Sequence, residues 1–148
     1  MLIMASDLRK FSIRTKAVDR STGKPQVLNI TDQVKDAAKK SDIQNGIVNI
    51  FMPGSTGGIS TLEFEPGLVK TDVPEFLQKI IPEGPDYAHH KTWGDHNGGG
   101  HLRSFLIYPS ITIPVKNGSP LLGTWQQVVF CEFDEKDRNR TIYCQFVG

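Results

Sequence analysis

Side chains that can do chemistry are concentrated in residues 87–103, and all four histidines of the chain fall within this segment. The same segment contains Asp95, Asn97 and Arg103 and is rich in glycine. Imidazoles bind metals or move protons near neutral pH, whereas guanidinium groups bind phosphates and carboxylates. We therefore expect this segment to form a metal site, a phosphate site or a general acid–base site.

The spacing of the histidines predicts which of them meet. Adjacent residues on extended backbone point to opposite sides, so only one of His89 and His90 should face the site. The glycine-rich loop is flexible enough to bring His101 back beside that histidine. Such an arrangement suits a divalent metal, zinc or magnesium, and it suits a metal-free acid–base pair or phosphate contact as well. A surface or packed histidine is the remaining alternative.

Other polar residues of this region have two interpretations each. Asp95 and Asn97 fit either an Asx-turn or contacts to a ligand. Arg103 is expected to open a strand at the edge of the glycine loop, where its fork of donors would contact phosphate; a structural ion pair is the alternative. Glu63 is a candidate metal ligand or base, or a solvated carboxylate.

A second glycine-rich loop covers residues 53–58 and carries the hydroxyls of Ser55 and Thr56. Its backbone N–H groups and hydroxyls suit an anion, although an ordinary tight connection has the same composition. Trp125 and Gln126 form either a stacking wall with an amide that recognises a heteroatom or, for Trp125, part of the core.

The scaffold of these residues is predicted from hydrophobic periodicity and turn residues. A helix begins at Thr31 or Asp32 and is stopped by Asn45-Gly46, and a second runs from Asp72 to Ile81 as part of the core. Asn117-Gly118 makes a hairpin turn. Extended segments are predicted for residues 11–18, 47–52, 59–64, 104–115, 124–133 and 141–147. The expected fold is one α+β domain over residues 1–148, a mostly antiparallel sheet or sandwich with about two helices.

Length and charge narrow the class of protein. A chain of 148 residues is about one domain long, and seventeen Lys plus Arg against sixteen Asp plus Glu argue against nucleic-acid binding. No stretch approaches the roughly 20 apolar residues of a membrane span, so a cytoplasmic protein without a membrane partner is expected. Cys131 and Cys144 lie on two candidate strands joined by the polar stretch 134–140, and a hairpin there would bring them close. We expect buried thiols there, with a cross-strand disulfide as the alternative.

Several spaced motifs together resemble the YjbQ family, also labelled secondary thiamine-phosphate synthase. The resemblance runs from about residue 47 to residue 148 and extends more loosely over residues 30–32. Its motifs are Tyr87-x-His89, Trp93-Gly94-Asp95-x-Asn97-Gly98-x-x-His101-x-Arg103, Pro109-Ser110 before residues 111–114, and Gly123-Thr124-Trp125-Gln126-Gln127.

The resemblance implies a homotrimer with its site near a subunit boundary. It also implies an activity that joins a pyrimidine pyrophosphate to a thiazole phosphate and releases pyrophosphate. Many family members carry a histidine where this chain has Gly54, so His90, His96 or Glu63 would complete a metal shell here. The residues that match the family position for position are His89, Glu63, Asn97, His101, Arg103, Trp125 and Gln126.

Three hypotheses follow. The leading one is a metal-dependent transferase or hydrolase acting on a phosphorylated small molecule; the second is a non-catalytic trimer that binds a metal or a phosphorylated metabolite; the third is a structural subunit. For the first, the expected catalytic residues are His89, His101 and Glu63, the metal ligands His89, His101 and His90, and the substrate contacts Ser55, Thr56, Asp95, Asn97, Gly98, Arg103, Trp125 and Gln126.

Overall fold

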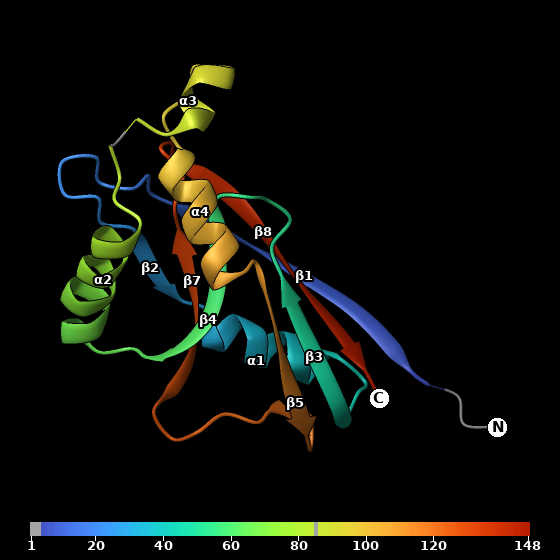
Figure 1. Cartoon of the computed structure of the whole chain (residues 1–148). Helices are drawn as coiled ribbons and strands as arrows, with labels where there is room; N and C mark the ends of the chain where they lie inside the picture. Colours follow the sequence, from blue (N-terminus) through green and yellow to red (C-terminus); the bar gives the residue numbers. More distant parts are fainter. Residues whose placement is uncertain (1–3, 85) are drawn as a thin grey trace.

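Two antiparallel β-sheets form the scaffold of the computed structural model, which describes residues 4–84 and 86–148 (Figure 1). One sheet has the strand order β1-β8-β3-β5-β6 and the other the order β2-β7-β4, and every pair of neighbouring strands in them is antiparallel. This confirms the expected α+β class. The strands are β1 (Ser6–Thr15), β2 (Gln26–Asn29), β3 (Asn45–Phe51), β4 (Gly57–Glu63), β5 (Ser110–Lys116), β6 (Ser119–Pro120), β7 (Gln126–Glu132) and β8 (Arg138–Val147).

The helices outnumber the expected two. In the described part of the chain they are α1 (Thr31–Lys40), the π-helical turn η1 (Leu68–Asp72), α2 (Val73–Ile80), α3 (Ala88–Trp93) and α4 (Gly98–Ile107). None of these helices is long and apolar enough to cross a membrane. The segment predicted as a glycine loop followed by a strand is therefore mostly helical.

Glycine in α4 serves close packing rather than loop flexibility. A Cβ added at Gly100 would lie 2.2 Å from the backbone oxygen of Phe133, just beyond β7. A Cβ added at Gly58 in β4 would lie 2.7 Å from the side chain of Ile107. These contacts outweigh the low helix propensity of glycine, which is why the prediction of a loop here was wrong.

The main core lies between the two sheets and α1. Val34, Ala37 and Ala38 of α1 are buried against apolar residues from both sheets, including Ile50 and Phe130. The predicted helix is thus confirmed, although it ends at Lys40, and the Asn45-Gly46 expected to stop it begins β3.

Capping of α1 and the environment of α2 differ from expectation. Asn29 Oδ1 accepts the backbone N–H of Thr31 at 3.0 Å, and neither Thr31 nor Asp32 caps the helix with its own side chain. In α2, Leu77 is buried but Phe76 and Ile80 are exposed, so the prediction of a helix wholly packed in the core holds only in part.

The C-terminal strands pair differently from the prediction. Asn117 and Gly118 have positive φ and form the expected turn between β5 and β6. However, β7 and β8 belong to different sheets, so they do not form the hairpin that would bring the two cysteines close. Cys131 and Cys144 are both free and buried, as the thiol interpretation expected, and burial raises the pKa of each to about 12.

Candidate active site

Helices α3 and α4 bring the histidines together. His89 and His90 lie in the first turn of α3, and not on the extended backbone expected from the sequence. Gly94, with a φ of +73°, ends α3 in the left-handed conformation and donates its N–H to the His90 carbonyl at 3.1 Å. After a short loop, α4 places His101 in its first turn. Because successive helical residues diverge by about 100°, only one of the two adjacent histidines can face His101.

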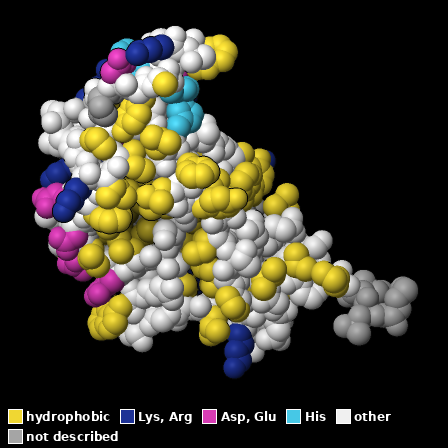
Figure 2. All heavy atoms as spheres, viewed as in Figure 1, with side chains coloured by type: hydrophobic (Ala, Val, Ile, Leu, Met, Phe, Trp, Pro, Cys, Tyr) yellow, Lys and Arg dark blue, Asp and Glu magenta, His cyan; other side chains and the backbone are white. Residues whose placement is uncertain are grey.

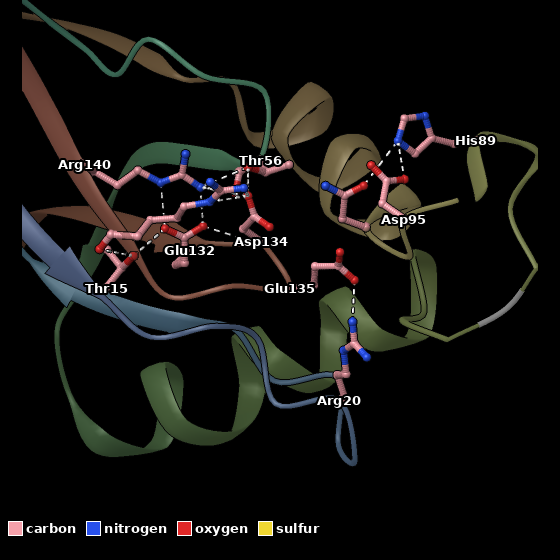
Figure 3. Close-up of polar contacts among 11 residues, drawn as sticks. Thr15, Arg20, Thr56, His89, Asp95, Glu132, Asp134, Glu135 and Arg140 are labelled. Carbon is pink, nitrogen blue, oxygen red and sulfur yellow. Dashed lines mark hydrogen bonds and ion pairs between the residues drawn. The ribbon is translucent and has the colours of Figure 1, made fainter. Parts of the chain in front are cut away.

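His89 is the histidine that faces His101. The centroids of the two rings are 4.6 Å apart, with an angle of 67° between the ring planes. His89 Nε2 lies 3.2 Å from Asn97 Oδ1, its hydrogen-bond partner, and 3.1 Å from Asp95 Oδ1. Figure 3 shows His89 directed at Asp95. The two imidazoles thus meet at one half-buried site, as the sequence predicts, and Asp95 and Asn97 lie beside them. Contact of Asp95 and Asn97 with a ligand stays a prediction.

The polar surroundings of His89 suit proton transfer. Asp95 Oδ1 is buried and has no hydrogen-bond partner among the described residues, although it lies within ion-pair distance of His89. A carboxylate beside an imidazole fixes the position and orientation of the ring. His101 lies at the edge of the same ring, so one imidazole can accept a proton while the other donates one.

His90 has a different role. Its Nε2 accepts the backbone N–H of Gly98 at 3.0 Å, and its ring lies 5.3 Å from that of His96. His90 therefore anchors the first residue of α4, and the Gly98 N–H is not free for the substrate contact predicted for it. With His90 occupied, the three-ligand arrangement of His89, His101 and His90 is not formed. Across residues 4–84 and 86–148, no group of three or more His, Cys, Asp or Glu side chains is arranged to hold a metal ion.

Arg103 does not contact a phosphate site. It lies on α4 rather than at the start of a strand, and its side chain is 0% exposed. Its Nε donates to the Ile81 carbonyl at 3.0 Å, Nη1 to the Gly23 carbonyl at 2.8 Å, and Nη2 to Gln78 Oε1 at 2.9 Å. These bonds tie α4 to the end of α2 and to the loop before β2, so the prediction of phosphate contact is wrong and the alternative structural role applies.

Glu83 is the ionic partner of Arg103. Its Oε1 lies 3.5 Å from Arg103 Nη1 and accepts no hydrogen bond from the described residues. Burial raises the pKa of the Glu83 carboxyl, and Arg103 partly opposes this effect. Burial likewise lowers the pKa of Arg103, against the influence of Glu83.

The loop before β4 adjoins a buried ionic cluster that the sequence did not predict (Figure 3). Thr56 Oγ1 donates to Asp134 Oδ2 at 2.9 Å and accepts from Arg140 Nη2 at 2.9 Å, so its hydroxyl is already used within the protein. Ser55 is exposed. Arg140 also forms a two-pronged ion pair with Glu132, whose side chain is 0% exposed. In the sequence, the signal for this cluster is Glu132, a charged residue within the otherwise apolar run 128–133.

Glu63, Trp125 and Gln126 lie far from the histidines, at the other end of β4 and β7. Glu63 at the end of β4 is opposite Gln126 at the start of β7, and Trp125 precedes it. The other end of β4, at Gly57, contacts α4 through a bond from Ser104 Oγ to the Gly57 carbonyl. Six residue steps of about 3.4 Å separate the two ends by roughly 20 Å. Trp125 is 72% exposed, so the alternative of a core tryptophan is wrong.

Hydrophobic side chains border the histidines on the surface. Figure 2 shows the histidines at one end of α4, with hydrophobic groups continuing along the rest of that helix. The exposed apolar residues of this face are Leu102, Phe105, Leu106 and Tyr108. The site therefore opens beside a surface that a monomeric protein seldom leaves uncovered.

A family model, curated proteins and solved structures resemble this chain. Residues 16–148 match the family model described as UPF0047 protein YjbQ-like. A UPF0047 protein of Methanocaldococcus jannaschii is 33% identical over 147 residues, with 99% of each chain covered. A crystal structure of a YbjQ-like protein of unknown function from Sulfolobus solfataricus superposes with a TM-score of 0.88 at 27% identity, covering 99% of each chain. A hypothetical protein from Aeropyrum pernix superposes with a TM-score of 0.82 at 30% identity, covering 96% of this chain and 98% of the other.

Proposed function

The chain belongs to the UPF0047 family of YjbQ-like proteins, and from this premise and the site geometry we propose that it is an enzyme acting on a phosphorylated small molecule. The observation that carries the proposal is the contact between His89 and His101, with Asp95 and Asn97 around Nε2 of His89. In this proposal, the imidazole pair moves the proton that the reaction requires.

The roles of the site residues follow from their contacts. Asp95 and Asn97 hold the ring of His89, so that His89 and His101 present one proton acceptor and one proton donor to a bound molecule. The reaction that the family resemblance implies is a finer version of the proposal. In it the thiazole nitrogen bonds to the carbon that carried the pyrophosphate, and the pyrophosphate leaves with the electrons of the broken C–O bond and takes up the proton that the donor imidazole supplies.

We also propose that the working form is a cyclic homotrimer. Glu63, Trp125 and Gln126 match the family motifs, yet they lie at the opposite end of the three-stranded sheet from α3 and α4. A head-to-tail ring places one end of each copy against the other end of the next copy. The exposed apolar face of α4 and the exposed Trp125 supply surfaces for this contact, and Glu63, Trp125 and Gln126 of one copy then approach the histidines of its neighbour.

Substitution of His101 tests the catalytic part of the proposal. His101→Gln should abolish turnover of phosphorylated heterocycles, detected by release of phosphate or pyrophosphate, while His96→Gln serves as the matched control because His96 is exposed. The same assay is run after treatment with a chelator and after addition of zinc or magnesium. Turnover that is unchanged in His101→Gln would refute the role of the pair, and ligand-dependent melting shifts without any turnover would favour the alternative of a non-catalytic binding protein.

The mass of the assembly tests the trimer. We expect light scattering to give three times the chain mass of 16.5 kDa. Phe105→Glu should shift the protein toward monomer, because this side chain is 81% exposed on the apolar face of α4. A stable monomer of the unmodified protein would refute the ring.

A further inference from the structure

We propose that the loop 54–56 and Arg140 form a binding site for an oxyanion, the phosphate group of a phosphate ester or free phosphate. The inference rests on the proposed function and identifies the part of the protein that would hold the phosphate of its substrate. The name phosphate loop is used below for residues 54–56.

Arg140 is a buried donor with one free end. The side chain, on β8, is 10% exposed. Its Nε and Nη2 are bound to Glu132, and Nη2 also reaches Thr56. In contrast, Nη1 has no hydrogen-bond partner among the described residues, and it is not buried, so it is accessible to solvent. A guanidinium held rigidly on one edge therefore presents two N–H groups of Nη1 to a further acceptor.

Gly54 leaves this free end uncovered. A Cβ at Gly54 would lie 3.3 Å from Arg140 Nη1 and 2.8 Å from Met52 Sδ. Any larger side chain would occupy the space in front of Nη1. The absence of a side chain at Gly54 thus keeps open the approach of a ligand to the guanidinium.

The phosphate loop adds further donors beside Arg140. The backbone N–H groups of Gly54, Ser55 and Thr56 have no acceptor within the described part of the chain. The Ser55 side chain is exposed and makes no hydrogen bond with the described residues. Consecutive unpaired N–H groups, a hydroxyl and a guanidinium edge are the donors that an oxyanion accepts from.

The net charge of the cluster does not attract an anion, so any selectivity must come from the directed hydrogen-bond donors. The cluster contains the carboxylates Glu132 and Asp134 and the guanidinium groups of Arg138 and Arg140, which balance. Glu132 and Asp134 bind the guanidinium groups from the interior of the protein. The Thr56 side chain, which donates to Asp134, lies between this carboxylate and the exposed part of the loop. We therefore expect selectivity for tetrahedral oxyanions with several acceptors over chloride at equal ionic strength.

The phosphate loop and His101 are linked through the first turn of α4. The Phe133 N–H donates to the Thr56 carbonyl at 2.9 Å, and the Phe133 carbonyl is the atom that a Cβ at Gly100 would meet. Gly100 directly precedes His101. Figure 3 shows Thr56 and Arg140 on one side of α4 and His89 on the other. A phosphate on this loop would leave the rest of a substrate to extend across the start of α4 toward the imidazole pair.

Substitution of Ser55 tests the site without disturbing the core. Arg140 itself is unsuitable, since its removal leaves Glu132 buried without its partner. Ser55→Asp places a carboxylate beside the free donors, and Ser119→Asp adds the same charge at another exposed serine, on β6. Inorganic phosphate is titrated into each protein at constant ionic strength and followed by ³¹P NMR line width and by melting temperature.

The unmodified protein and Ser119→Asp should bind phosphate equally, and Ser55→Asp at least about tenfold more weakly, as loss of a charge-assisted hydrogen bond predicts. Equal binding by Ser55→Asp, or no phosphate binding by the unmodified protein, would overturn the inference. Turnover assays of His101→Gln and Ser55→Asp separate this inference from the proposed function. If phosphate binding depends on Ser55 but the unmodified protein shows no turnover, only the proposed enzyme is refuted. If turnover depends on His101 but Ser55→Asp has an unchanged KM, only the phosphate site is refuted.

Discussion

Replacing Arg103 by methionine should destabilise the protein strongly, because the structure uses this guanidinium as an internal brace. The substitution keeps much of the side-chain volume but removes three hydrogen bonds, to Ile81, Gln78 and Gly23, and the charge that faces Glu83. Removing one partner of a buried ion pair typically costs about 3–5 kcal/mol, since the other charge stays buried. Glu83, whose side chain is 7% exposed, is in this position.

The pH dependence of this loss identifies Glu83 as its source. Burial already raises the pKa of Glu83 in the intact protein, so protonation of this carboxyl favours the folded state. Without Arg103 the folded-state pKa rises further. The stability deficit of Arg103→Met should therefore be largest at neutral pH and shrink as the pH falls toward 4.5, the ordinary value for glutamate.

Urea unfolding followed by circular dichroism measures the effect at both pH values. Glu83→Gln introduced into the Arg103→Met background should recover part of the lost free energy at pH 7, because it removes the uncompensated charge. Arg9→Met is the control, since both partners of its ion pair with Asp7 are partly exposed, at 40% and 23%, and its loss should cost about 1 kcal/mol or less. A loss below about 1 kcal/mol in Arg103→Met, or no recovery in the double variant, would refute the structural role.

Three further predictions concern the core. Burial tends to raise the pKa of Asp134, but hydrogen bonds from Thr56 and Arg138 hold this pKa below its ordinary value. The stability that ionised Asp134 contributes should therefore be lost as the pH falls through the lowered pKa. Thr56→Val removes one of these hydrogen bonds and should move the midpoint of acid unfolding to higher pH. Gly100→Ala should lower the melting temperature far more than Gly123→Ala, because only the first brings a Cβ to 2.2 Å from a backbone atom; equal melting temperatures would contradict the packing of α4. Cys131 and Cys144 should resist a thiol reagent at pH 8 until the protein is unfolded, since burial keeps both thiols protonated with pKa values of about 12, and rapid labelling of the native protein would show otherwise.

Local patterns in the sequence determined much of the scaffold. The helical spacing of Val34, Ala37 and Ala38 predicts α1, and the Asn117-Gly118 turn follows from the ability of these residues to adopt positive φ. The convergence of His89 and His101 was also foreseen, because two short segments joined by a turn hold them within thirteen positions of the chain. Each of these inferences depends on residues that are near one another in sequence.

Only the tertiary structure decided the role of each charged group. Arg103 and Arg140 are both arginines at the end of a polar segment, yet one is buried among carbonyls from three distant segments and the other has a free edge beside Gly54. The helical state of residues 98–107 likewise depends on how closely α4 approaches the end of β7. Hydrogen-bond partners and close contacts of this kind join residues far apart in the chain, and local periodicity contains no information about which of them meet.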